Sequence, residues 1–418
     1  MLSKKKACVL AAVLVVVASA CSSSKHASST SATSATTTAG SSPSSGGTTI
    51  TIGVLTDATG LAASGNQTSI MGARAGGVVA AKDGIKLKFV EADTQSSPTG
   101  ALTAAQKLVD QDHVSAVIAV SALAFGGASF LTKEGIPVVG AAEDSTEWVT
   151  SPNMFGVFGD NNSTKVSTTL GLFFKMEGVT NLGSVGYGIS PQSAASAKGT
   201  ALSAQAEGIK IGYLNANFPF GSTNVQPDAL AMKSAGVNGF TAPVDPNTGF
   251  AFVSALRQLG VPPKVALLPT GYGGDLTQAG PGAIQSGQGV YFYISFEPVE
   301  MHTAATEEFQ QALNAVGVTS DPTYAEYEGY AAVAMLIQAL KTTGANPSHS
   351  ALINALNGIQ SYDALGLLGS HSFAPGAHLS VPGSPGNCVY VTKLSGSSFD
   401  LVPGADPVCG TPLPNLTA

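Results

Sequence analysis

Charged residues are scarce in this chain of 418 residues, where Asp, Glu, Lys and Arg together make up 11%. The 19 Lys and Arg residues form no cluster beyond the extreme N-terminus, and the formal charge is −7 with a pI near 5.3. Nucleic acids and anionic membrane surfaces are bound by basic patches. The composition therefore predicts no nucleic-acid partner.

The motifs of common enzyme classes are also missing. The chain has no Gly-x-Ser-x-Gly, no His-Glu-x-x-His, no Walker A sequence, and no Gly-x-Gly-x-x-Gly after an expected strand. We expect no catalytic residues, no cofactor and no metal. Because a catalytic triad assembled in space leaves no mark in the sequence, an exported enzyme stays open as an alternative.

No apolar run beyond the N-terminus is long enough to span a membrane, and the N-terminal one is short. Lys4–Lys6 precede the apolar stretch 7–17, which is typical of a secretory signal over residues 1–20. The sequence Ala18-Ser19-Ala20-Cys21 resembles the lipobox of bacterial lipoproteins, in which the cysteine is lipidated. Ala18 departs from the usual Leu, Val or Ile, so an ordinary signal peptide cut before Cys21 stays open.

The segment after Cys21 supports the lipoprotein interpretation. Residues 22–48 are almost entirely Ser, Thr, Ala and Gly, which cannot bury a core. Such a coil reaches about 30 Å, enough to hold a folded domain clear of a membrane. We therefore expect residues 21–48 to be a lipidated cysteine and a flexible linker, which places the protein outside the cytoplasm on the cell membrane.

Only two cysteines remain in the folded part, Cys388 and Cys409. In an exported chain such a pair predicts a disulfide bond. Closing a loop of this length contributes about 3 kcal/mol in the chain-entropy model. A metal site is disfavoured because Cys-x-x-Cys and paired-histidine spacings are absent.

Apolar, β-branched runs alternate with Ala-rich amphipathic stretches through residues 49–418, the pattern of an α/β fold with parallel strands. Strands are expected at 49–55, 87–91, 116–120, 136–139, 183–187, 209–214, 237–242, 264–268 and 290–293. Helices are expected at 68–82, 98–111, 125–133, 167–176, 193–207 and 324–342. Ligands bind beyond the carboxyl ends of parallel strands, so the loops 56–66, 121–126 and 140–148 become the candidate site.

Four segments resemble the type I periplasmic binding proteins, in particular their leucine/isoleucine/valine and amide-binding branch. They are ITIGVLTDATGLAASGNQTSIMGARAG, VEADTQSSPTGALTAAQKLVDQDHVSAVIA, EGIPVVGAAEDSTEWV and YAEYEGYAAVAMLIQALKTTG. Their order and spacing match the family over nearly all of the chain after the linker.

The resemblance implies two doubly wound parallel-sheet lobes joined by three crossing strands, near 155–161, 292–299 and 365–373. Lobe I would comprise 49–158 plus 300–368, and lobe II 159–299 plus 369–418. It also implies that the lobes close on a small ligand, which is then delivered to an ABC transporter permease. We expect a monomer.

In amino-acid-binding members of the family, a ligand carboxylate meets a hydroxyl and backbone N–H groups at helix N-termini of the first lobe. The matching turn here contains Ser121, Ala122 and Ala124. Asp57 stands in the first of the three candidate loops, 56–66. Ser121 is the expected hydroxyl, the alanines would act through their N–H groups, and a role for Ser121 in capping the helix stays open.

The next loop departs from the family pattern, since Glu143 and Asp144 stand where amide or hydroxyl side chains are usual. An acid there would repel a carboxylate. Asp144, with Ser145, could accept hydrogen bonds from an amine, amide or hydroxyl, or Asp144 could cap a helix over 145–148. Trp148 would line the cleft or belong to the core.

On the second lobe the family brackets its ligand with an aromatic and an acid. The corresponding residues are Tyr187, Asp245 and Tyr272, with Asp275 close by; exposed loop positions are the alternative for each. We expect a small polar solute, with amino acids or amides first. Two alternatives remain. The protein could be a sensor of the same fold that signals to a partner protein, or it could be a structural module that binds nothing.

Overall fold

The computed structural model describes residues 48–418 except 143, 159–164, 281, 345 and 380–386. The predicted signal peptide, Cys21 and the linker up to residue 47 lie outside the described residues, as does Glu143. Within the described part, no helix has both the length and the hydropathy needed to cross a membrane.

The first sheet has five parallel strands in the order β2-β1-β3-β4-β5. The strands are β1 (Thr49–Thr56), β2 (Lys86–Asp93), β3 (Ala116–Val120), β4 (Val138–Gly140) and β5 (Met154–Gly156). Alternate side chains of a strand point to opposite faces, so a strand that is covered on both sides is apolar throughout. In β3, the side chains of Ile118 and Val120 belong to one hydrophobic cluster, and those of Val117 and Ala119 belong to another.

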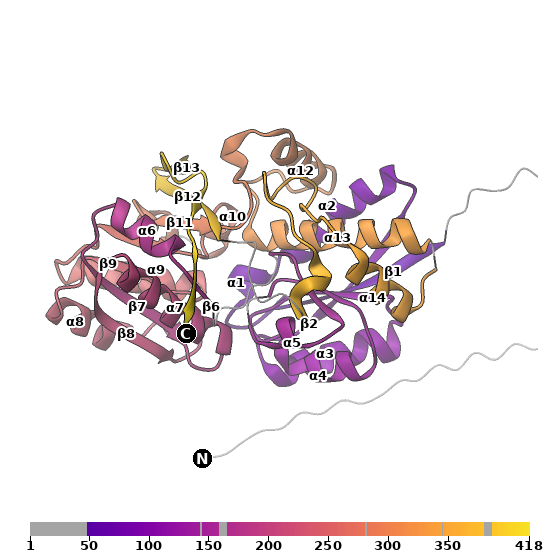
Figure 1. The fold of residues 1–418 in the computed structure, drawn as a ribbon, viewed down its shortest axis with the longest axis horizontal. Coiled ribbons are helices and arrows are strands. Elements are labelled where there is room, and N and C mark those ends of the chain that lie inside the picture. The colour runs from indigo at the N-terminus through magenta and orange to yellow at the C-terminus, as the bar shows by residue number, and fades with distance from the viewer. Residues whose placement is uncertain (1–47, 143, 159–164, 281, 345, 380–386) are drawn as a thin grey trace, which may run out of the picture. The chain divides into compact units, whose positions relative to one another are not determined.

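Helices cover both faces of this sheet (Figure 1). One layer contains α2 (Ser69–Lys82) and α13 (Tyr324–Thr343), and the other contains α3 (Pro98–Gln106) and α4 (Phe125–Lys133). The helices α2 and α13 approach so closely that a Cβ atom at Gly72 would stand 2.0 Å from the carbonyl oxygen of Glu326. Long-range packing thus holds α13, which follows β11 in the chain, against the first sheet.

The second sheet has eight strands, with the main order β13-β12-β11-β10-β9-β7-β8 and β14 paired to β12. The parallel strands are β7 (Asn181–Tyr187), β8 (Lys210–Phe218), β9 (Gly239–Thr241), β10 (Val265–Leu268) and β11 (Tyr291–Ile294). The antiparallel strands are β12 (Cys388–Ser395), β13 (Ser398–Leu401) and β14 (Val408–Cys409).

Helices again lie on both faces of the second sheet. Val265 and Leu267 of β10 pack with α6 (Thr169–Met176) and α7 (Pro191–Ala206). Ala266 and Leu268 belong to the cluster that includes α8 (Gln226–Ser234) and α9 (Pro246–Gln258). The α/β fold with parallel-sheet lobes is therefore confirmed.

The chain passes between the two sheets after β5, after β11 and before β12. The remaining helical elements are α1 (Ala63–Asn66), the π-turn η1 (Lys107–Gln111), α5 (Glu147–Thr150), α10 (Gly274–Gln278), α11 (Ala283–Gly287), η2 (Val299–Met301), α12 (Ala304–Ala315), α14 (His349–Gly358) and η3 (Pro375–Leu379). The helix expected over 98–111 ends at Gln106, and its last turn is widened as η1.

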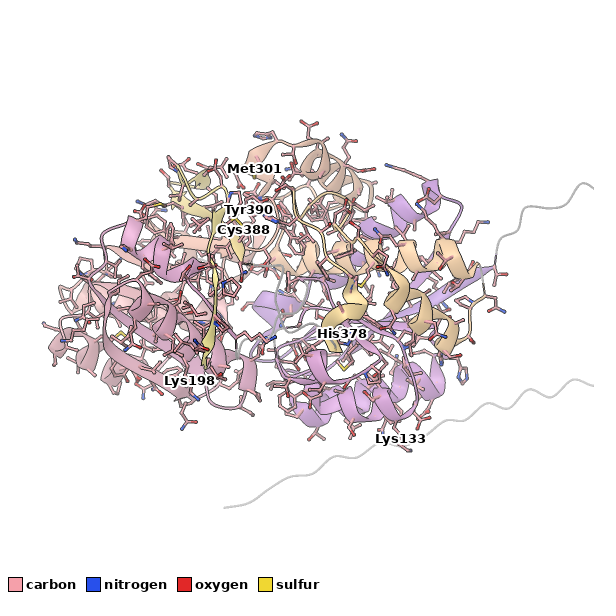
Figure 2. All side chains as sticks on the ribbon, in the orientation of Figure 1. Lys133, Lys198, Met301, His378, Cys388 and Tyr390 are labelled. Atoms are coloured by element: carbon pink, nitrogen blue, oxygen red, sulfur yellow. A yellow bond between two sulfur atoms is a disulfide. The ribbon has the colours of Figure 1, made fainter. Side chains whose placement is uncertain are left out.

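The C-terminal strand β15 (Pro412–Thr417) pairs antiparallel with β6 (Lys165–Ser167). The predicted disulfide joins Cys388, at the start of β12, to Cys409 of β14 (Figure 2). His371 lies near the two sulfur atoms, all three candidate donor atoms being within 4.8 Å of one another. Because the sulfurs are bonded to each other, they offer no thiolate to a metal ion.

Candidate functional site

A cavity of about 720 Å³ lies where loops of both sheets meet. The first sheet contributes Asn66 and Ala122 from the loops after β1 and β3, and α13 contributes Glu328. The second sheet contributes Tyr187, the last residue of β7, and Asp245, which follows β9. The site thus stands at the carboxyl ends of parallel strands, where open α/β sheets bind ligands.

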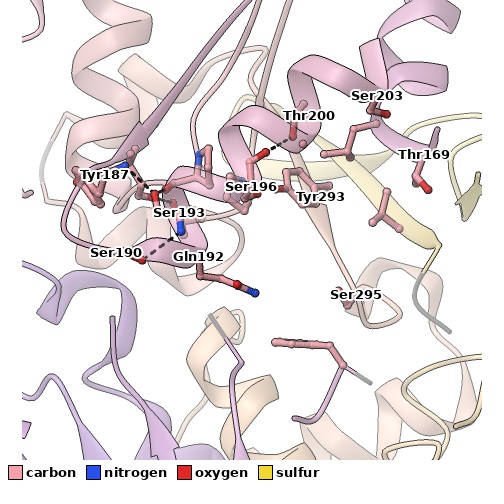
Figure 3. Close-up of a pocket in the computed structure, with 18 of the residues that line it drawn as sticks. Thr169, Tyr187, Ser190, Gln192, Ser193, Ser196, Thr200, Ser203, Tyr293 and Ser295 are labelled. Carbon is pink, nitrogen blue, oxygen red and sulfur yellow. Dashed lines mark hydrogen bonds between the residues drawn. The ribbon is translucent and has the colours of Figure 1, made fainter. Parts of the chain in front are cut away.

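Helix α7 forms one long wall of the cavity (Figure 3). Apart from Gln192 near its start, its lining residues are small: Ser193, Ser196, Gly199, Thr200 and Ser203. A helix rises 1.5 Å per residue, so the wall from Ser190 to Ser203 extends over about 20 Å. The small side chains leave room for the cavity along this helix.

The hydroxyl groups at the start of α7 hold the helix in place. Ser190 accepts a hydrogen bond from the Ser193 N–H at 3.2 Å, and the Ser193 hydroxyl accepts one from the Tyr187 N–H at 2.8 Å and donates to the carbonyl of Pro243. These polar atoms therefore serve the fold. Ser196, at the middle of the wall, is half-buried and has a hydroxyl without such a structural contact.

The turn predicted to bind a ligand carboxylate already holds a carboxylate of the chain. Asp57 is wholly buried and accepts hydrogen bonds from the Ala122 N–H at 2.8 Å and the Ser121 hydroxyl at 2.8 Å. It also accepts from Asn66 Nδ2 at 2.7 Å and from the Thr94 hydroxyl. Two of the three groups expected to contact a ligand carboxylate, the Ser121 hydroxyl and the Ala122 N–H, are thereby engaged by Asp57, and the Ala124 N–H donates to the Ser121 carbonyl at 3.5 Å.

Asp144 lies in the loop after β4, at the position where the family resemblance implies an amide or hydroxyl side chain. Its carboxylate accepts hydrogen bonds from the Phe125 N–H, at the N-terminus of α4, and from Trp148 Nε1 at 2.8 Å. It is wholly buried, and this burial raises the pKa of Asp144 to about 7. The expected capping of a helix over 145–148 is wrong, because α5 begins at Glu147 after the N-cap Thr146.

The loop after β4 contacts the other lobe through its backbone. Gln192 Nε2 donates to the carbonyl of Ala142 at 3.0 Å, and the Gln192 N–H donates to the carbonyl of Asp144 at 3.3 Å. The Ser190 hydroxyl donates to the same Asp144 carbonyl at 3.3 Å. The N-terminus of α7 therefore bridges the two lobes at the cavity.

On the second lobe, Asp245 stands at the cavity wall with 9% of its surface exposed. It is the N-cap of α9 and accepts from the Thr248 N–H at 3.1 Å and hydroxyl at 2.9 Å. The Tyr187 hydroxyl also donates to it. Burial, reinforced by this carboxylate, raises the pKa of Tyr187 above its ordinary value, so the phenol stays a neutral donor.

Tyr272 is wholly buried away from the cavity. Its ring packs against Phe399 and Tyr327, and its hydroxyl donates to Glu300 at 2.5 Å. Asp275, which lies in the same segment, does line the cavity, and accepts from the Gly271 N–H at 3.2 Å.

Of the predicted ligand contacts, Ala122, Tyr187 and Asp245 line the cavity. The others lie outside its wall, where their own neighbours bury them: Asp57, Ser121, Ala124, Asp144, Ser145 and Tyr272. The ligand contacts of all of these residues stay predictions. Trp148 is 2% exposed and belongs to the core beside Asp144.

Sequence reasoning missed several cavity residues. Asn66 and Glu328 lie within segments already noted, but nothing in their spacing distinguishes them from structural residues. Phe158 and Ser295 follow β5 and β11, and only their place at a crossing between lobes marks them. The five β15 residues that line the cavity gave no sequence signal.

The charge of the cavity wall is mainly negative. Asp245, Asp275 and Glu328 carry carboxylates, and Lys165 is the one cation among the described lining residues. A carboxylate ligand would meet like charges there, whereas an N–H donor would meet acceptors.

Two parallel-sheet lobes with a cavity at their strand ends define the class of two-lobed solute-binding proteins. The profile of the family described as "Periplasmic binding protein" matches residues 49–398, and the chain belongs to this family. The family binds small ligands for ABC-type transporters and consists of binding proteins rather than enzymes.

Solved structures share the fold at low sequence identity. A solute binding protein from R. palustris in complex with 4-hydroxybenzoate is 19% identical, covers 85% of this chain and 96% of its own, and has a TM-score of 0.69. A branched-chain amino acid transporter substrate binding protein from Streptococcus pneumoniae, in complex with isoleucine, is also 19% identical, with 84% and 98% covered and a TM-score of 0.68. A leucine binding protein from Thermotoga maritima is 16% identical, with 84% and 97% covered and a TM-score of 0.67. No curated protein matches the chain in sequence.

Proposed function

We propose that this protein is an extracytoplasmic lipoprotein that captures a small polar ligand bearing N–H donors, such as an amide or amine, and delivers it to an ABC permease. The observation that carries the proposal is the cavity between the lobes, which presents Asp245 and Asn66 while the chain's own Asp57 engages the nearby anion-binding turn.

The polar end of the ligand would lie between Asn66 and Asp245. Asn66 Nδ2 donates to Asp57, and Asn66 is part of the cavity wall, so we assign the acceptor role to its Oδ1. Asp245 adds a carboxylate on the opposite lobe. A ligand that donates to both oxygens would stabilise the closed arrangement of the lobes more than the open one, which is the requirement for ligand-driven closure.

Thermal-shift and calorimetric titrations of the purified protein with amides, amines, amino acids and carboxylates test the ligand class. A ligand at one hundred times its Kd adds about 2.7 kcal/mol of stability. We expect binding of amides or amines, with the affinity lowered at least about tenfold in Asp245→Asn, the loss expected for a buried charge-assisted hydrogen bond. Asp400→Asn, an exposed change on β13, is the matched control. Binding of carboxylates alone would contradict the proposal.

Lipid anchoring is tested separately. We expect the protein to partition into the detergent phase and to incorporate labelled fatty acid, and Cys21→Ser to abolish both. Cys8→Ser, within the predicted signal peptide, is the control. Detergent partitioning that survives Cys21→Ser would contradict the anchor.

A further inference from the structure

The C-terminal residues 399–418 lie beyond the part of the chain that the family profile matches. They nevertheless complete the cavity, because Pro412, Leu413, Pro414, Leu416 and Thr417 of β15 all line it. In Figure 1 this strand descends in yellow beside the second sheet, where it pairs with β6. The cavity of this chain therefore includes a wall that lies outside the family match.

The position of β15 is held by specific contacts. The disulfide ties Cys409 to Cys388, and the Gly410 N–H donates to the carbonyl of Asn387 at 2.7 Å. Next along the chain, Thr411 exchanges two hydrogen bonds of 2.9 Å with Thr168. Gly410 packs so closely that a Cβ atom there would stand 2.3 Å from the Thr169 nitrogen. These contacts hold the chain against the start of α6 immediately before β15 begins to line the cavity.

Apolar side chains make up most of the cavity wall around β15, where Lys165 of β6, paired with Thr417, is the one cation among the described lining residues. Leu413, Leu170 and Val389 contribute hydrocarbon surface. The hydroxyls in this region are used by the fold: Thr169 donates to the carbonyl of Asn387 at 2.6 Å, and Thr200 donates to the carbonyl of Ser196 at 2.9 Å. A ligand group in this compartment would find mainly hydrocarbon around Leu413, with Lys165 at the Thr417 end of the strand.

The two ends of the cavity therefore differ in chemistry. The end between the lobes has Asn66 and Asp245, and the end under β15 has the apolar compartment just described. The α7 wall from Ser190 to Ser203, about 20 Å long, runs between them. An amide or amine with a short side chain would occupy only the first end.

We propose that β15 is a specificity element, which forms an apolar compartment for the hydrocarbon end of an elongated amide or amine ligand. This inference rests on the proposed function, because it takes the N–H donors of the ligand to lie at Asn66 and Asp245. It adds that the ligand carries an unbranched or slender apolar chain, which runs along α7 past Ser196 to Leu413.

Straight-chain primary amides from acetamide to hexadecanamide, whose extended chain is as long as the α7 wall, are the probes, titrated into the purified protein by calorimetry. Each methylene that becomes buried contributes about a fourfold gain in affinity. We expect the affinity to rise with chain length until the compartment is filled. Leu413→Ala lowers the affinity of the longest amides by about tenfold and leaves acetamide unaffected, since a leucine side chain loses most of its buried area.

Two further variants separate a local effect from misfolding. Asn415→Ala changes the one residue of β15 between Pro412 and Thr417 that does not line the cavity, and it leaves the whole series unchanged. Ser196→Phe places a ring midway along α7, so it abolishes the gain in affinity for long amides. A thermal unfolding transition like that of the wild type shows that each variant is folded.

The outcomes distinguish the two proposals. Short amides that bind with no dependence on chain length, or a Leu413→Ala variant that retains the full dependence, would overturn the role of β15 and leave the proposed function intact. If no amide or amine of any length binds to the wild-type protein, the proposed function fails and this inference fails with it.

Discussion

The carboxylate of Asp57 accepts a hydrogen bond of 2.8 Å from the backbone N–H of Ala122, at the turn that leads into α4. Such a turn, with its unpaired N–H groups, is a ready site for an anion. In this protein the anion is a side chain of the same lobe. The family resemblance alone would place a ligand carboxylate there, and this contact is the reason why the ligand proposed above bears N–H donors instead.

Replacing Asp57 should expose that turn. In Asp57→Gly the Ser121 hydroxyl and the Ala122 N–H lose a buried charged partner, which costs about 3 kcal/mol of unfolding free energy. We expect formate or acetate to restore part of the loss in denaturation experiments. The same anions should leave the wild type unchanged. A variant as stable as the wild type, or one indifferent to formate, would show that Asp57 is not the ion that satisfies this turn.

Stability should fall as the pH rises toward neutrality. Burial raises the pKa of Asp144 and the pKa of Glu326 to about 7 in the folded protein. The folded state therefore holds these protons more tightly than the unfolded state, where the carboxyls titrate near pH 4. Each group contributes stability on the order of 3 kcal/mol that is present at pH 4 and lost by pH 7.

Urea denaturation between pH 4 and pH 8 measures this slope. Glu326→Gln is expected to flatten it, because Gln keeps the capping box with Thr323 and cannot titrate. Glu134→Gln, on the exposed end of α4, serves as the control and leaves the slope as it is. A wild-type protein whose stability rises from pH 4 to pH 7 would contradict the assignment.

The packing of α2 against α13 should tolerate no added methyl group. A Cβ atom at Gly329 would stand 2.1 Å from the carbonyl oxygen of Ser69, and backbone cannot yield as a flexible side chain does. We expect Gly329→Ala to cost about 1–3 kcal/mol of unfolding free energy. Gly358→Ala, at the end of α14 with nothing within 4 Å of the new atom, is expected to be neutral or slightly stabilising. Equal effects of the two changes would show that helix propensity alone, and not packing, governs both sites.

The strands and helices of the parallel sheets could be predicted because burial on both faces leaves a continuous apolar run, as in Ala116–Val120. Ser97, which caps α3, and Pro98 at its first turn likewise mark a boundary that the sequence displays. Segments without such a pattern were not predicted, among them α12, α14 and β15. In β15, Pro412 and Pro414 are poor strand formers, and pairing with β6 overrides their preference.

The site could be predicted only to the level of its loops. Ala122, Tyr187 and Asp245 follow strands whose ends the sequence reveals, and all three line the cavity. The hydrogen bonds of the Asp57 and Asp144 carboxylates to backbone N–H groups could not be predicted. An acid beside a helix N-terminus has the same sequence pattern whether it contacts a ligand or a neighbouring N–H. The cavity along α7 depends on small side chains on one face of that helix. Because α7 is rich in Ala and Ser throughout, its hydrophobic periodicity does not distinguish that face from the others.

Removing the disulfide tests how firmly the C-terminal segment is held. Cys388 and Cys409 are 21 residues apart, and closing a loop of that size contributes about 3 kcal/mol in the chain-entropy model. We expect the double variant Cys388→Ser, Cys409→Ser to lose about that much unfolding free energy. A reductant should destabilise the wild type equally and leave the double variant unchanged, which separates the bond from the substitutions. Because Cys409 lies three residues before β15, proteolysis within 410–418 should accelerate in parallel. Full stability and unchanged proteolysis after reduction would mean that β14 and β15 are held by strand pairing alone.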